Sequence, residues 1–164
     1  MDSIDKFNKL SKAEFISIFG NIFEKTEWVA ERCYESKPYN NLDELVSKMM
    51  KIFENIEKER HLEILNSHPD LAVEKKLTED SKNEQKNASL NQCNDAEFIE
   101  FKKLNEEYKK KFGFPFIIAV KGKNKEEILN SFRQRITNNI NLEFEEAKKQ
   151  VKKIASFRLG EIIK

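Results

Sequence analysis

Apolar residues recur at intervals of three and four along most of the chain, a spacing that is typical of amphipathic α-helices. The first clear start is the capping box Ser11-Lys12-Ala13-Glu14, in which the serine accepts from the helix backbone and the glutamate reaches back. The apolar positions that follow at helical spacing are Phe15, Ile18, Phe19, Ile22 and Phe23.

The same spacing predicts further helices over 28–34, 42–53, 57–66, 78–85, 95–112, 124–137 and 142–163. Asn41 and Thr78 precede two of them as N-caps, and Gly113 stands where a left-handed residue ends the helix over 95–112. In the last helix we expect six residues to point inward: Phe144, Ala147, Val151, Ile154, Ala155 and Leu159.

The segment 114–120 breaks this pattern. It reads Phe-Pro-Phe-Ile-Ile-Ala-Val, is apolar on every side, and lies between Gly113 and Lys121-Gly122. Periodicity alone predicts a buried strand, but a lone strand among helices has no partner for its N–H and C=O groups. We therefore expect an extended, non-helical segment whose backbone polar groups can bind a ligand.

Composition narrows the class of protein. The chain of 164 residues fits one domain, 1–164, and its 30 basic and 29 acidic residues leave a net charge of +1. That balance argues against a nucleic-acid-binding protein, and no apolar run approaches the ~20 residues of a membrane helix. Cys33 and Cys93 show neither metal-ligand spacing nor a disulfide framework, and no signal peptide or peroxisomal address is evident. We expect a cytoplasmic, all-α protein of about seven to nine helices.

Candidate chemistry centres on Ser67-His68-Pro69-Asp70-Leu71-Ala72, which holds one of only two histidines. Histidine is the side chain whose unperturbed pKa lies nearest neutral pH. Proline restricts the preceding residue to extended conformations, so His68 should leave the end of a helix in a fixed direction.

Other polar residues are candidates only in combination. Ser81, Glu84 and Gln85 stand at i, i+3 and i+4 and would share one helix face, although a solvated face is the simpler interpretation. Arg158 follows apolar positions of the last helix and could equally form a salt bridge; Arg133 and Arg135 are as available on these grounds. His61 with His68 could form a metal site, but no third ligand is evident.

Taken together, these motifs resemble the 2-oxo-4-hydroxy-4-carboxy-5-ureidoimidazoline (OHCU) decarboxylase family of urate degradation. The matching pieces stand in the family's order and cover most of the chain from residue 60 on. They are His68–Ala72, Leu77-Thr78, Ser81–Gln85, Leu104–Tyr108, Phe112–Val120, Val151–Ala155 and Arg158-Leu159.

The resemblance implies a helical bundle, commonly a homodimer, that decarboxylates OHCU to (S)-allantoin without a cofactor or metal. It implies that His68, Glu84 and Arg158 are catalytic. It also implies that Pro69, Ser81, Gln85 and the backbone of Phe116, Ile117, Ile118, Ala119 and Val120 bind the substrate. The chain departs from the family in a short connection at 73–76 and in Ala88-Ser89-Leu90-Asn91 where the family has Ala-Gly-Leu-Asp.

Three alternatives remain at this point. One is a non-catalytic helical interaction module with the same fold, and another is a lyase acting on a related ureido or imidazole compound. The third, a metal-dependent hydrolase, would use His61 and His68.

Overall fold

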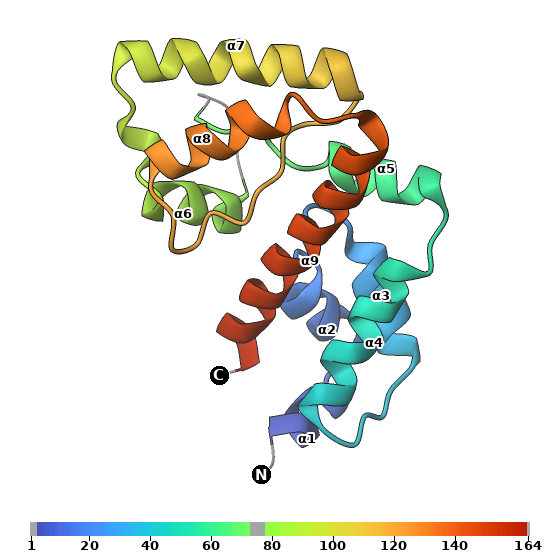
Figure 1. Ribbon diagram of the computed structural model, residues 1–164. Coiled ribbons are helices and arrows are strands. Elements are labelled where there is room, and N and C mark those ends of the chain that lie inside the picture. Colours follow the sequence, from blue (N-terminus) through green and yellow to red (C-terminus); the bar gives the residue numbers. More distant parts are fainter. Residues whose placement is uncertain (1–2, 73–77, 164) are drawn as a thin grey trace. The chain divides into compact units, whose positions relative to one another are not determined.

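The computed structural model describes residues 3–72 and 78–163, and within these ranges it forms helices and no β-strand (Figure 1). The order is α1 (Ser3–Asn8), α2 (Lys12–Phe19), α3 (Glu27–Glu35), α4 (Leu42–Glu54), α5 (Lys58–Asn66), α6 (Glu79–Asn87), the 3-10 turn η1 (Leu90–Gln92), α7 (Asp95–Phe112), α8 (Lys125–Arg135) and α9 (Ile140–Ile163). The all-α prediction is confirmed. The short connection at 73–76 lies outside the described residues. No described helix is both long and apolar enough to cross a membrane.

Five of the helices, α2, α4, α6, α7 and α8, begin where a side chain satisfies one of the first backbone N–H groups. The capping box at α2 is complete: Ser11 Oγ accepts from the Glu14 N–H at 3.2 Å, and Glu14 Oε1 accepts from the Ser11 N–H at 3.0 Å. The Asn41 side chain caps α4, and the Thr78 side chain caps α6 by accepting from the Ser81 N–H. Gly113 ends α7 with φ +81°, a left-handed conformation that glycine adopts without a steric cost.

The structure differs from the predicted helices in three details. The six-residue helix α1 was not predicted, and α9 begins at Ile140, two residues before the expected Leu142. Phe144, expected to point inward, is only half-buried, whereas its neighbour Glu143 is fully buried. The buried face of α9 therefore includes polar side chains.

The chain separates into two compact units. The first contains residues up to Ser67 together with those from Lys152 onward, and the second contains His68–Val151. Helix α9 contributes residues to both units. The expectation of one domain stays a prediction.

The first unit has a core of aromatic side chains from α1, α2, α4 and the turn after α2. The ring of Phe19 packs against those of Phe7 and Phe15, and Phe23 stacks on Phe53 with ring centroids 4.9 Å apart. The phenylalanine-rich composition thus supplies much of this core.

The second unit is built around a second aromatic cluster. Tyr108 of α7 makes edge contacts with Phe114, Phe116 and Phe132, and Phe116 stacks on Phe132 of α8 at 3.9 Å with an interplanar angle of 8°. These contacts place the non-helical segment after Gly113 against α7 and α8. Figure 1 shows this segment as an extended trace that connects the two helices.

Candidate active site

His68 directly follows the end of α5. The C-cap residue Ser67 has helical angles, and Pro69 then ends any further helix. The side chain of His68 is neither fully buried nor fully exposed. The histidine therefore stands at the start of a short loop, 68–72, as the His-Pro sequence predicts.

Side chains from α6 and α7 hold the rest of this loop. Gln85 of α6 donates from Nε2 to the carbonyl of Asp70 at 3.2 Å and accepts at Oε1 from the Ala72 N–H at 3.1 Å. Asn105 of α7 donates to the carbonyl of Leu71 at 3.0 Å. Because both amide side chains are buried, these bonds replace the loop's hydrogen bonds to water and fix its backbone.

An ion pair completes the anchoring of the loop. Nζ of Lys109 lies 2.6 Å from Oδ2 of Asp70, whose side chain is only 12% exposed. Ala72 has φ +55°, a left-handed conformation that is costly for a residue with a Cβ. The surrounding hydrogen bonds thus hold the backbone behind His68 in one strained conformation, an arrangement found where a site must be rigid.

The polar helix α6 turns one face inward. Ser81 and Gln85 are buried and Glu84 is partly buried, whereas Lys82 and Asn83 are exposed. The i, i+3, i+4 spacing therefore gives these three side chains a common face. Gln85 has a use that the sequence did not reveal, because both ends of its amide hold the 68–72 loop.

The segment Phe116–Val120 is buried at every residue, and two of its backbone groups are bound by side chains. Nη1 of Arg135 donates to the carbonyl of Ile117 at 2.7 Å, and Oε1 of Gln150 accepts from the Ala119 N–H at 3.0 Å. Side chains thus take the place of a neighbouring strand.

Ile118, between these two residues, is different. In an extended backbone, alternate residues direct their N–H and C=O groups to opposite sides. Ile118 is 7% exposed, and within residues 3–72 and 78–163 its N–H and C=O groups have no hydrogen-bond partner. Buried backbone groups are nearly always paired, so this donor and acceptor are available for a ligand or water.

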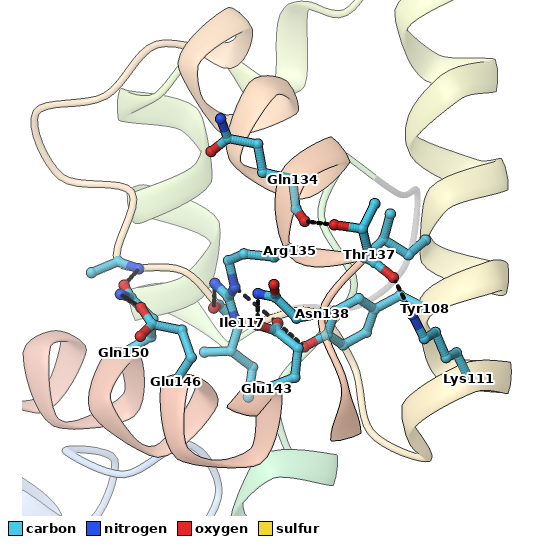
Figure 2. A network of polar contacts seen from close by, with 12 residues as sticks. Tyr108, Lys111, Ile117, Gln134, Arg135, Thr137, Asn138, Glu143, Glu146 and Gln150 are labelled. Carbon is cyan, nitrogen blue, oxygen red and sulfur yellow. Dashed lines mark hydrogen bonds and ion pairs between the residues drawn. The ribbon is translucent and has the colours of Figure 1, made fainter. Parts of the chain in front are cut away.

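Arg135 belongs to a buried polar network, which Figure 2 shows from close by. Its Nε lies 2.9 Å from Oε1 of Glu143, and the hydroxyl of Tyr108 donates to the same oxygen at 2.6 Å. Asn138 donates to the other oxygen, Oε2, at 3.1 Å. Burial, followed by the bond to Glu143, raises the pKa of Tyr108 far above its usual value, so the phenol stays protonated and donates.

Arg158, the arginine expected to be catalytic, lies in the first unit. It is 5% exposed, its Nη2 lies 2.8 Å from Oε2 of the fully buried Glu24, and its Nη1 donates to the carbonyl of Asn21 at 2.7 Å. The guanidinium is therefore fixed in direction by a buried ion pair.

His61 is held by backbone and an aromatic ring. Its Nε2 lies 2.7 Å from the carbonyl of Phe53, and its ring packs edge-on against Phe53. The described residues contain no group of three side chains that could hold a metal ion. These contacts give the metal-hydrolase alternative no support.

Comparisons with known proteins agree with this helical architecture. The chain is 41% identical over 164 residues to the uric acid degradation bifunctional protein of Bacillus sp. (strain TB-90), covering 100% of this chain but 33% of that protein. It is 36% identical over 159 residues to the OHCU decarboxylase of Haloferax volcanii, covering 97% of this chain and 95% of that one. The chain thus spans about a third of the bifunctional relative and nearly all of the single-function one.

Two solved structures are similar in fold. A crystal structure of (S)-allantoin synthase has a TM-score of 0.80 at 29% identity, covering 100% of this chain and 54% of that chain. A crystal structure of OHCU decarboxylase in the presence of (S)-allantoin has a TM-score of 0.71 at 26% identity, covering 83% of this chain and 90% of that chain.

The fold and these relatives define the class of protein as a carboxy-lyase, an enzyme that removes carbon dioxide from its substrate. The family model described as OHCU decarboxylase matches residues 8–160. The chain belongs to the OHCU decarboxylase family.

Proposed function

We propose that this protein converts OHCU into (S)-allantoin and carbon dioxide in urate degradation, without a cofactor, and that His68 is its acid/base. The observation that carries the proposal is the anchored loop 68–72. A family match over residues 8–160 coincides with a histidine that is followed directly by an anchored loop: the buried side chains of Gln85 and Asn105 bind the loop backbone, and Lys109 binds the side chain of Asp70.

The reaction breaks the bond between a carboxylate and a carbon that also bears a hydroxyl group. When carbon dioxide leaves, the bonding electrons form a C=C bond to the adjacent ring carbon, and the nitrogen of the former C=N unit takes up a proton, which gives an enol. The enol hydroxyl then loses its proton while the neighbouring, ureido-bearing carbon gains one on a single face, which leaves a carbonyl group and gives the S product. Positioned proton transfer of this kind contributes ~10²–10⁴-fold to a rate.

His68 is the group we assign to this proton transfer, because an imidazole serves as either acid or base near neutral pH. A fixed loop backbone supports the assignment, since a proton donor must reach only one face of the product carbon. Pro69 would contact the substrate beside it.

Helix α6 would bind the ureido group and the ring N–H groups. Glu84 is the charged acceptor in this assignment, and Ser81 lies on the same inward face. Gln85 can still contribute, because its amide oxygen has a second lone pair and its nitrogen a second hydrogen beyond those bound by the loop.

The backbone of Phe116, Ile117, Ile118, Ala119 and Val120 would hold the plane of the ring. The N–H and C=O groups of Ile118, which have no hydrogen-bond partner among the described residues, support this role, because one amide-like edge of OHCU offers the matching acceptor and donor. Binding would satisfy two buried polar groups at once.

Arg158 would bind a carbonyl or the developing oxyanion. The Glu24 pair supports this role because it orients a guanidinium whose rigid set of N–H donors suits an oxyanion.

A homodimer is our proposal for the assembly, and the cytoplasm for the location. Exposed apolar side chains on α7 and at the start of α9, which a partner could cover, are Phe98, Ile99, Ile140 and Leu142. Neither Cys33 nor Cys93 forms a disulfide, as expected in a reducing compartment. Light scattering during gel filtration and cell fractionation test these two points.

The activity is tested by supplying freshly made OHCU and following (S)-allantoin by circular dichroism. Decay in buffer has no preference for one face and gives no net signal, whereas the enzyme should give a growing signal of the S form. Wild-type protein that yields no more (S)-allantoin than buffer would refute the proposal and favour a non-catalytic module or a lyase with another substrate. Glu84→Gln protein should fold as wild type does and lose most of its rate of (S)-allantoin formation.

A further inference from the structure

We propose that Arg135, held by Glu143 and Tyr108, is a positioning residue that keeps the Phe116–Val120 backbone ready for substrate. The inference rests on the proposed role of this backbone and extends it to residues that need not touch the substrate. Figure 2 shows the residues concerned.

Arg135 contacts the Phe116–Val120 segment directly. Nη1 of Arg135 donates to the carbonyl of Ile117 at 2.7 Å, directly next to Ile118. The same guanidinium lies over the ring of Phe116, with its central carbon 4.4 Å from the ring centroid. One side chain therefore fixes both the backbone and the side chain of the segment.

Glu143 fixes the position of Arg135. Its Nε pairs with Oε1 of Glu143, which is fully buried and also accepts from Tyr108 and Asn138. These partners come from α7, the turn before α9 and α9 itself. Among these four residues the charges are those of Arg135 and Glu143, which form an ion pair, and this pair gives the guanidinium one stable orientation.

Gln150 binds the backbone of the segment on the other side of Ile118, at Ala119. Gln150 accepts from the Ala119 N–H, and its own Nε2 donates to Glu146 at 2.8 Å. Because Ile117 and Ala119 are both bound, Ile118 can turn only to the other side of the extended chain. The binding-competent conformation is built before substrate arrives.

The energetic consequence concerns binding more than chemistry. If the segment populates other conformations, the apparent affinity falls by the fraction that remains competent. Substrate at saturation selects the competent form again. Loss of the hydrogen bond from Arg135 to Ile117 should therefore raise KM for OHCU and change kcat little.

The test is Arg135→Lys, which keeps a positive charge opposite Glu143 but cannot reproduce the fork that also reaches Ile117. We expect KM for OHCU and Kd for (S)-allantoin to rise on the order of tenfold, with kcat within about threefold of wild type. Hydrogen exchange in peptides covering 114–122 should become faster without ligand. The control is Arg133→Lys, two residues earlier in α8, whose pair with Glu100 is exposed; it should match wild type in all three measurements.

Folded Arg135→Lys protein with wild-type KM and wild-type exchange would overturn the inference, as would a fall in kcat with KM unchanged. If Arg135→Lys does not fold, Tyr108→Phe replaces it, and a smaller rise in KM in the same direction is expected. Failure of the proposed function is distinguishable, because wild-type protein would then neither turn over OHCU nor bind (S)-allantoin, while the exchange measurement would still report on the hold.

Discussion

The protein buries two arginine–glutamate pairs, and we propose different roles for their guanidinium groups. Arg135 and Glu143 lie 2.9 Å apart in the second unit, and Arg158 and Glu24 lie 2.8 Å apart in the first. Around the first pair, Tyr108 and Asn138 also bind the carboxylate, and the guanidinium ends on the carbonyl of Ile117.

In the second pair, Nη1 of Arg158 also donates to the carbonyl of Asn21, in the turn after α2. Burial of a charge is costly unless a partner compensates it, so each pair must hold its arginine in one orientation. The two arginines differ in the group that each guanidinium is oriented to bind. Arg135 positions a backbone segment, whereas Arg158 is the guanidinium we propose to meet the substrate.

The largest effect should come from removing a buried carboxylate. Glu143→Ala leaves the guanidinium of Arg135 buried without its counter-ion and takes the acceptor from Tyr108 and Asn138. We expect a loss of about 3–5 kcal/mol in the free energy of unfolding. Urea denaturation measures it, and Glu24→Ala provides the comparison for the other pair. A Glu143→Ala protein within about 1 kcal/mol of wild type would mean that the network is not a stabilising unit.

A smaller effect should follow from Tyr108→Phe, which removes one hydrogen bond to a buried carboxylate and keeps the aromatic packing. Hydrogen bonds to charged groups contribute about 1.5–3 kcal/mol, and we expect a loss within that range. Thermal unfolding checks it. A variant as stable as wild type would show that the 2.6 Å contact contributes nothing net.

Alkaline pH should affect the first pair, because Glu143 accepts a hydrogen bond from the hydroxyl of Tyr108. The pKa of Tyr108 is raised in the folded state by burial and by Glu143. The folded protein therefore holds this proton above pH ~10, where the unfolded chain releases it, and stability falls as pH rises further. One such group contributes about 1.4 kcal/mol per pH unit. Urea denaturation between pH 9 and 11 should show a flatter dependence for Tyr108→Phe than for wild type; equal slopes would contradict this account.

The smallest effect is expected for Arg133→Ala. Its guanidinium makes two hydrogen bonds to Glu100, at 2.7 and 2.6 Å, but its side chain is 48% exposed. Exposed pairs contribute ~0–1 kcal/mol, so the midpoint of urea unfolding should barely move. A loss as large as that of Glu143→Ala would remove the distinction between buried and exposed pairs.

Much of the fold could be predicted because it is encoded locally. The caps at Ser11, Asn41 and Thr78 and the glycine after α7 each satisfy backbone groups of their own helix, so a few neighbouring residues reveal them. Helix α1 was missed because its six residues carry no such signature.

The buried polar residues could not be predicted in this way. A hydrophobic pattern assigns polar side chains to the outside, so it chose Phe144 and passed over Glu143 and Gln150. Their burial depends on partners outside their own helix: Arg135 precedes Glu143 by eight residues, and Ala119 precedes Gln150 by 31. The residue pattern alone also left Arg133, Arg135 and Arg158 equivalent; the family resemblance singled out Arg158, and the structure gives each arginine different partners.

If His68 transfers the proton, as we propose, the initial rate of (S)-allantoin formation should fall steeply in His68→Asn protein. Asparagine keeps a polar side chain of similar reach but cannot exchange a proton near neutral pH. With folding verified by thermal unfolding, we expect a loss of ~10²-fold or more relative to wild type. A folded His68→Asn enzyme that forms (S)-allantoin at near wild-type rate would contradict it.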